Sequence, residues 1–330
     1  MQDHDVVAIG NALVDVIAHC DDAFLAAHER TKGSMALIDV PTMETLYGAM
    51  GPGIEMSGGS AANTMVGVAS FGGKAGFIGK TASDQIGEVF RHDIRAAGVT
   101  FETPASADDE PTGRSLILVT PDGQRTMNTF LGVSPHLGNG EVDANLIRSA
   151  QILYLEGYLF DRDEAKTAFR EAATIAAGAG RRVALTLSDP FCVDRHRAEF
   201  LQLVKSSVDI LFANEAEIMS LYETSSFDLA AQRAKADTKF AALTRSEKGS
   251  VILAGGEAIE IPAAPVAEVV DTTGAGDLYA AGVLLGVARN LPMETAGKLG
   301  SLAAAEVISH VGARPQVPLT ELARSRGLLA

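Results

Sequence analysis

The sequence predicts an α/β protein with three layers, in which helices cover both faces of a mostly parallel sheet, together with a small second sheet that forms a lid. The first observation is that short apolar runs alternate with helical segments from position 152 onward, as in repeated strand–helix units. The second is that early extended segments and a hairpin around Pro121-Asp122-Gly123 do not fit this alternation. We therefore expect one domain over residues 1–330, with a lid built from discontinuous segments at roughly 13–40 and 111–131.

The main sheet is expected from apolar runs of strand length. These runs lie at 6–9, 74–79, 152–155, 183–187, 210–213, 240–243 and 251–253. Helices are expected from apolar periodicity and capping residues at 60–71, 83–97, 163–177, 200–204, 215–222, 278–288, 293–309 and 320–329. In a sheet of this kind, ligands bind beyond the carboxyl ends of the strands.

Composition limits the classes of function. The 330 residues are 47% hydrophobic, enough for a sizeable core, and their formal net charge of −15 argues against a nucleic-acid partner. No apolar run reaches the length of a membrane span, and the polar residues 1–5 do not resemble a signal peptide. Cys20 and Cys192 lie outside any C-x-x-C spacing. We expect a soluble, cytoplasmic protein that acts on a small molecule, with neither a nucleic-acid nor a membrane partner.

The segment 271–277, with sequence DTTGAGD, directly precedes the apolar run of a buried helix. Its two glycines let bare amides approach a ligand, and amides in the first turn of a helix attract anions. Asp277 lies in the same turn, so a proton-accepting carboxylate stands beside an anion site, as phosphoryl transfer to a hydroxyl requires. The plainer interpretation is a flexible turn whose aspartate complements the helix dipole. Oxygen atoms of Asp271, Thr272 and Thr273 could cap the helix, bind a cation, or do both.

A second polar cluster consists of Gly58-Gly59-Ser60 and Asn63. The two glycines let a polyol approach the backbone, and Asn63 offers a donor and an acceptor to its hydroxyls. Asp15 is a charge among apolar neighbours that could accept hydrogen bonds from the same hydroxyls. The plainer interpretations are a flexible loop with an ordinary helix cap, and a strand-end aspartate that pairs with a backbone amide.

Asn214 and Glu217 follow an expected strand, where oxygen groups could organise Mg²⁺ through water. The same pair fits a capping box, and the two roles are compatible. Arg125 lies in the hairpin, where a solvated charge is the plainer interpretation. Two common nucleotide motifs are absent, because a P-loop would need glycine at Lys74 and the dinucleotide fingerprint would need glycine at Tyr279.

Together these features resemble the ribokinase-like, or pfkB-type, carbohydrate kinases over nearly the whole chain, from Gly10 to Pro315. The most specific elements are the segment 271–277 and the diglycine motif with Asn63. The resemblance implies a ribokinase-like fold and a kinase that uses ATP and Mg²⁺. It leaves room for a monovalent cation such as K⁺.

The resemblance also implies roles for single residues. Asp277 would take the proton of the acceptor hydroxyl, and the amides of Gly274, Ala275 and Gly276 would form the anion hole. The residues expected to bind the acceptor are Asn11, Asp15, Gly58, Gly59, Ser60 and Asn63. Those expected to contact ATP are Arg125, Asn214, Thr244, Gly249 and Thr273, with Glu217 holding Mg²⁺ through water. The nucleotide loop departs from the family pattern at Ser246, where a glycine is common.

Within the family, the segments 11–15 and 58–64 look most like those of adenosine kinases. The leading interpretation is therefore an ATP- and Mg²⁺-dependent kinase that phosphorylates the primary hydroxyl of a ribonucleoside and yields the 5′-monophosphate. A sugar kinase acting on ribose, fructose or a related carbohydrate is the alternative. A non-catalytic nucleoside or sugar sensor is less favoured, because Asp277 and both glycines of the motif are intact. The sequence is compatible with a monomer or a homodimer.

Overall fold

The computed structural model describes residues 3–107 and 109–330, and it confirms the predicted α/β fold with a large and a small sheet. Met1 and Gln2, part of the polar start of the chain, lie outside the described residues. In the described part, the nine strands of the large sheet are, from edge to edge, β14 (Glu257–Ile261), β13 (Ser250–Ala254), β12 (Phe240–Thr244), β11 (Ile210–Asn214), β10 (Arg182–Thr186), β9 (Ala150–Glu156), β1 (His4–Ile9), β5 (Ala75–Ile78) and β6 (Val99–Thr100).

The large sheet is parallel except at one edge. Neighbouring strands run parallel from β6 to β12, whereas the pairs β12–β13 and β13–β14 are antiparallel. The exception follows from short connections, because a parallel crossover needs about a dozen residues or more. Only Gly255 and Gly256 separate β13 from β14, and both adopt the positive φ that a tight hairpin requires.

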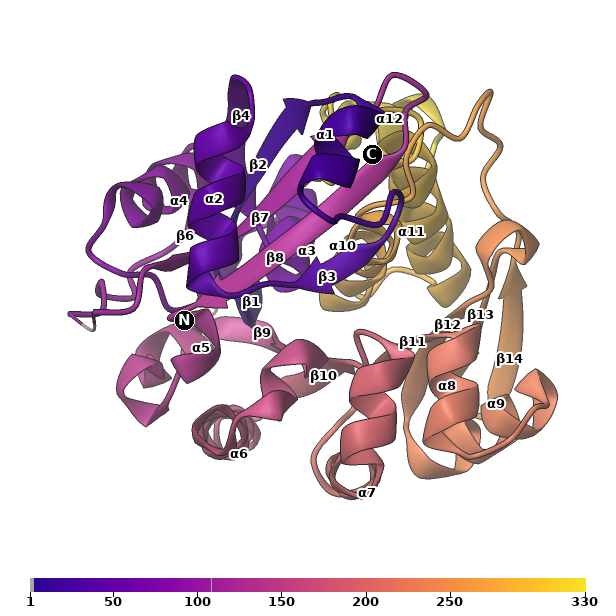
Figure 1. Cartoon of the computed structure of the whole chain (residues 1–330). Coiled ribbons are helices and arrows are strands. Elements are labelled where there is room, and N and C mark those ends of the chain that lie inside the picture. The colour runs from indigo at the N-terminus through magenta and orange to yellow at the C-terminus, as the bar shows by residue number, and fades with distance from the viewer. Residues whose placement is uncertain (1–2, 108) are drawn as a thin grey trace.

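Two helical layers cover the large sheet, as Figure 1 shows. Alternate residues of β1 enter separate cores, Val6 and Ala8 on one face and Val7 and Ile9 on the other. The first core is covered by α3 (Ser60–Ser70), α4 (Gln85–Ala96), α10 (Ala275–Ala288), α11 (Met293–Val307) and α12 (Leu319–Ser325). The second is covered by α5 (Ala144–Ser149), α6 (Asp163–Gly178), α7 (Pro190–Ser206), α8 (Glu215–Leu221) and α9 (Phe227–Asp237). No helix in the described ranges is long and apolar enough to cross a membrane.

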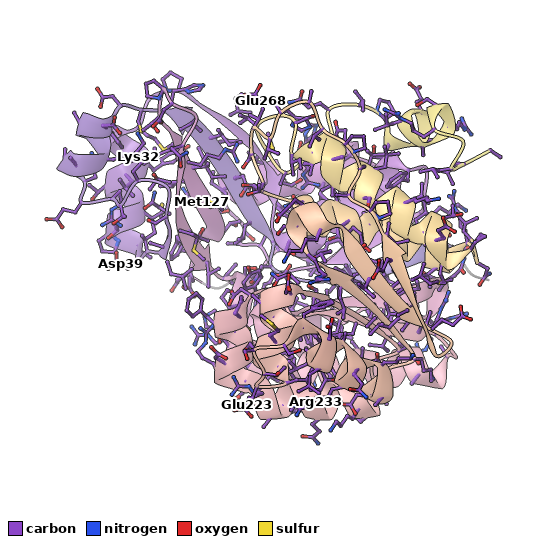
Figure 2. All side chains as sticks on the ribbon, turned by 90° about the vertical axis from the view of Figure 1, so that its right-hand side faces the viewer. Lys32, Asp39, Met127, Glu223, Arg233 and Glu268 are labelled. Atoms are coloured by element: carbon purple, nitrogen blue, oxygen red, sulfur yellow. The ribbon has the colours of Figure 1, made fainter. Side chains whose placement is uncertain are left out.

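The small sheet contains the hairpin and the early extended segments. Its strands, in spatial order, are β3 (Met35–Leu37), β8 (Arg125–Gly132), β7 (Thr112–Val119), β2 (Leu13–His19) and β4 (Gly53–Gly58). The short helix α1 (Asp22–Ala27) follows β2 in the chain, and the helix α2 (Val40–Ala49) lies between β3 and β4. The edge strand β4 lies outside the two lid segments expected from the sequence. In Figure 2 the small sheet, marked by Met127 of β8, and the nearby residues Lys32 and Asp39 lie away from the region of Glu223 and Arg233.

The two faces of the small sheet have different neighbours. Val14, Val16 and Phe130 pack into the first core together with Met43 and Leu46 of α2. Because side chains alternate along a strand, the opposite face carries Asp15 and Arg125. This second face lies toward the segment 271–277, because Arg125 contacts Asp271.

Candidate active site

Helix α10 begins at the glycine-rich segment, and no side chain of the described structure caps it. Gly274 has a left-handed φ of 79°, and a Cβ there would lie 2.8 Å from the Cβ of Ala313. A Cβ on Gly276 would meet nothing within 4 Å. Packing within the chain therefore explains Gly274, whereas Gly276 leaves open space beside the amides of the first turn. Within this turn, Ala275 N donates to the carbonyl oxygen of Thr272 at 3.2 Å. A helix start without a side-chain cap, beside open space, suits an anion.

The carboxylate of Asp277 joins the two polar clusters of the sequence. Ser60 Oγ donates a hydrogen bond of 2.6 Å to Oδ1 of Asp277, and Asn63 Nδ2 donates one of 3.1 Å to Oδ2. Burial raises the pKa of Asp277, and these hydrogen bonds together with the charge of Arg314 oppose the rise. A carboxylate with a raised pKa is a stronger proton acceptor, which suits a general base. The structure thus brings Asp277 together with Ser60 and Asn63, two of the residues expected to bind the acceptor.

The diglycine loop passes close to Asp15 and Asn11. A Cβ on Gly58 would lie 2.5 Å from Cγ of Asp15. Gly59 has a φ of 97°, and a Cβ there would lie 2.3 Å from the carbonyl oxygen of Asn11. Burial raises the pKa of Asp15 to about 6, against the charges of Arg314 and Arg125. Both glycines are needed for the chain to approach Asp15 and Asn11 this closely.

Glu156, at the end of β9, is a buried acid that sequence reasoning missed. It is only 1% exposed. Its Oε1 accepts hydrogen bonds from Asn11 N at 3.2 Å and Nδ2 at 2.7 Å, and its Oε2 accepts one from Ala61 N at 2.8 Å. Burial raises the pKa of Glu156 to about 7. The only signal in the sequence was that Glu156 directly follows the apolar run 152–155. Its hydrogen-bond partners, Asn11 and Ala61, come from distant segments, so the sequence could not show them.

Arg125 lies in a buried ion pair. Its Nη1 is 2.5 Å from Oδ2 of Asp271, and the two side chains are 8% and 5% exposed. Nη1 also donates to Oγ1 of Thr273 at 3.3 Å. The buried Nε and Nη2 atoms have no hydrogen-bond partner among the described residues. Two unpaired guanidinium donors beside the anion site match the chemistry of a phosphate group.

Asn214 and Glu217 form the capping box that the sequence allowed. Asn214 Oδ1 accepts a hydrogen bond of 2.8 Å from Glu217 N, and Glu217 Oε2 accepts one of 2.9 Å from Asn214 N. Glu217 Oε1 accepts a third, from Asn214 Nδ2 at 2.6 Å. Glu217 is 5% exposed, and burial raises its pKa to about 7. Both carboxylate oxygens are occupied, so Glu217 fits an indirect contact with a metal better than a direct one.

The loop after β12 shows why a glycine is favoured at the position of Ser246. Ser246 has a φ of 52°, the left-handed region that glycine adopts most easily. Thr244 ends β12, and Gly249 has a φ of 82°. A Cβ on Gly249 would lie 2.1 Å from the carbonyl oxygen of Ile261. Close packing against β14 therefore accounts for the glycine at this position.

Comparison with known proteins agrees with this geometry. Residues 55–320 match the family described as pfkB family carbohydrate kinase. A probable sugar kinase from Rhizobium etli is 50% identical, with a TM-score of 0.92 over 100% of both chains. The adenosine kinase from Sinorhizobium meliloti is 52% identical, with a TM-score of 0.90 over 98% of this chain and 99% of that chain.

A curated relative, the ATP-dependent ribose-1-phosphate kinase of Halopiger xanaduensis, is 30% identical over 236 residues, which cover 70% of this chain and 73% of the relative. The family and the kinase class predicted from the sequence are thereby confirmed. The chain belongs to the pfkB family of carbohydrate kinases.

Proposed function

We propose that this kinase transfers the γ-phosphoryl group of ATP to the primary hydroxyl of a ribonucleoside, with adenosine as the leading acceptor. The observation that carries the proposal is the position of Asp277. Ser60 and Asn63 hold its carboxylate at the uncapped start of α10, directly beside the open space at Gly276. A base and an anion hole in one helical turn are what this reaction needs.

In the proposed reaction, Asp277 accepts the proton of the acceptor hydroxyl as its oxygen attacks the γ-phosphorus of ATP. The bond from the γ-phosphorus to the bridging oxygen breaks, and ADP leaves with that oxygen. The amides of Gly274, Ala275 and Gly276 stabilise the charge on the transferred group, and the unpaired donors of Arg125 bind phosphate oxygens.

Asn214, Thr244, Gly249 and Thr273 complete the proposed nucleotide site. No group of three or more His, Cys, Asp or Glu side chains within the described ranges could hold a metal ion. This fits Mg²⁺ that arrives with the nucleotide phosphates, and Glu217 would reach it through water. The ion would neutralise charge on the phosphate oxygens.

The small sheet favours a nucleoside over a free sugar as acceptor. In the strand register, Asp15 lies in one row with Ser115, Thr129 and Leu37. The adjacent row, on the same face, consists of the apolar residues Ile17, Ile117, Met127 and Met35. Met35 and Leu37 are 55% and 63% exposed. A polar position for the ribose beside an apolar surface suits an acceptor that carries a planar base, as in the related adenosine kinase.

A sugar kinase is the second candidate. The Rhizobium etli structure, described as a probable sugar kinase, is nearly as similar to this chain as the Sinorhizobium meliloti adenosine kinase. Asp15, Gly59 and Asn63 would hold the hydroxyls of ribose or fructose as well as those of a nucleoside.

We place the reaction in the cytoplasm, since Cys20 and Cys192 are free thiols and ATP is the donor.

An acceptor screen tests the proposal. ADP release would be measured with adenosine, other nucleosides, aminoimidazole riboside, ribose and fructose, with Asp277→Asn as the control for contaminating activity. We expect the highest kcat/KM with adenosine and AMP as the product. A sugar whose kcat/KM exceeds that of every nucleoside would overturn the nucleoside assignment.

A further inference from the structure

We propose that Arg314 is a positioning residue for phosphoryl transfer, which fastens the diglycine loop to the C-terminal segment and faces Asp15 and Asp277 with a fixed positive charge. Arg314 belongs to the segment Gly312-Ala313-Arg314-Pro315, to which the sequence assigned no role. The inference rests on the proposed kinase reaction, because it is tested mainly by the kcat/KM of that reaction, in which Asp277 is the proposed base.

The guanidinium of Arg314 binds both sides of the diglycine loop. Nε donates to the carbonyl oxygen of Ser57 at 3.1 Å, and Nη2 donates to the same oxygen and to Ser57 Oγ, the latter at 2.8 Å. Nη1 donates to the carbonyl oxygen of Ala62 at 3.2 Å. Ser57 lies in β4 and Ala62 in the first turn of α3. One side chain therefore bridges the strand before the loop and the helix after it.

A carboxylate also holds Ser57. Oδ2 of Asp93, on α4, accepts hydrogen bonds from Ser57 N at 2.7 Å and Ser57 Oγ at 2.6 Å. Ser57 is fully buried. The two glycines that follow lose more conformational freedom on folding than any other residue type, so the loop needs external anchors. Ser57 supplies them through Arg314 and Asp93.

The anchored loop leads directly to the base. Ser60 and Asn63 of α3 donate the two hydrogen bonds that hold Asp277. A displacement of the start of α3 would move both donors together. Arg314 thus acts on Asp277 through the loop and the helix, without a hydrogen bond to its carboxylate.

The charge of Arg314 has a separate effect. Its hydrogen bonds go to carbonyl oxygens and a hydroxyl, and the carboxylates that face it are Asp93 of α4, Asp15 of β2 and Asp277 of α10. Burial lowers the pKa of Arg314 to about 10, so the side chain stays protonated at neutral pH. The positive charge lowers the pKa of both Asp15 and Asp277, in opposition to burial.

Two further charges in the site act alongside Arg314. Arg125 of β8 supports the ionised form of Asp15. Asp277 raises the pKa of Asp15 and of Glu156, because like charges oppose ionisation. Removal of Arg314 leaves these groups in place, so we attribute the expected change in the titration of Asp15 and Asp277 to the lost positive charge.

The test compares the pH dependence of kcat/KM among variants, with adenosine as acceptor, from about pH 5 to about pH 9. In Arg314→Gln we expect the acid limb of the pH profile of kcat/KM to shift to higher pH by about one unit. The reason is that the positive charge beside Asp15 and Asp277 is lost. Arg314→Lys keeps the charge but cannot bridge both carbonyls. We expect it to keep the wild-type acid limb and to raise the KM for adenosine about tenfold, the size of a lost charged hydrogen bond.

Two control variants distinguish the role of Arg314 in holding the diglycine loop from the effect of its positive charge. Asp93→Asn weakens the hydrogen bonds that Asp93 accepts from Ser57 without removing a positive charge, so the acid limb of its pH profile should not shift to higher pH. Arg289→Gln removes an arginine that binds the carbonyl of Gly72, beyond the far end of α3 from Ser60, and should leave both the KM and the acid limb unchanged.

The outcomes decide between the proposals. Wild-type pH dependence and KM in Arg314→Gln would overturn the role of Arg314. If Arg314→Gln does not fold, Arg314→Lys decides, and a wild-type KM in that variant would overturn the anchor. Inactivity of the wild-type enzyme with every nucleoside would instead refute the proposed function, so the two failures can be distinguished.

Discussion

Substitution of Gly276 by alanine should slow the reaction while making the protein more stable. Gly276 lies in α10, and beyond its chain neighbours and the backbone of its own turn a Cβ at this position would meet nothing within 4 Å. Alanine favours the helical state over glycine by about 0.5–1 kcal/mol, so the free energy of unfolding should rise by up to that amount. The new methyl group would occupy the space that we assign to the transferred phosphoryl group.

The expected kinetic loss follows from the anion hole. Displacement of one preorganised donor from the transferred group typically costs about 10²-fold in kcat, which corresponds to about 2.7 kcal/mol in the activation free energy. Gly274→Ala is the matched control. Its φ of 79° and its contact with Ala313 predict a loss of stability of at least about 1–2 kcal/mol, the cost of a left-handed alanine.

The assay pairs urea denaturation with steady-state kinetics for both variants. We expect Gly276→Ala to unfold at the same or higher urea concentration than the wild type and to turn over about 10²-fold more slowly. Wild-type turnover in a stable Gly276→Ala protein would refute the interpretation of the helix start as the anion hole. If Gly276→Ala were destabilised as much as Gly274→Ala, the claim that a methyl group at position 276 meets open space would be refuted.

Two other predictions concern pH and the small sheet. Because burial raises the pKa of Glu156 from 4.5 to about 7, its ionisation opposes folding, and stability is lost as pH rises through that window. The unfolding free energy of Glu156→Gln relative to wild type should therefore rise by about 3 kcal/mol over the same pH range, and a constant difference in denaturation experiments would contradict this. If the small sheet is a lid, small-angle scattering should show compaction when adenosine is added, and an unchanged radius of gyration would count against closure.

The fold was predictable because its strands are apolar runs bounded by polar or glycine-rich turns. The runs at 6–9 and 210–213 lie within β1 and β11. Two strands that escaped detection, β14 and β4, lie at sheet edges. β14 carries Glu257 and Glu260 and has one buried residue, and β4 begins and ends with glycine. Edge strands lack the apolar content by which buried strands are detected.

The polar site was predictable only where the sequence itself clusters its residues. Asp277, Ser60 and Asn63 stand in glycine-rich motifs, and the structure joins them. Glu156 and Arg314 stand alone in the sequence, and their roles come from hydrogen bonds to segments 95 to 257 residues away. Periodicity and spacing cannot report such contacts. The capping box of Asn214 and Glu217 was one of two compatible roles that the sequence allowed, because its two members are three residues apart.

The most direct test of the central claim is single-turnover kinetics of Asp277→Asn with adenosine and MgATP. Asparagine keeps the shape of the side chain and can still pair with Ser60, but it cannot accept the hydroxyl proton. We expect the rate of AMP formation to fall by about 10²–10⁴-fold, while calorimetry shows adenosine bound with near-wild-type affinity. AMP formation at the wild-type rate would contradict the assignment of Asp277 as the base.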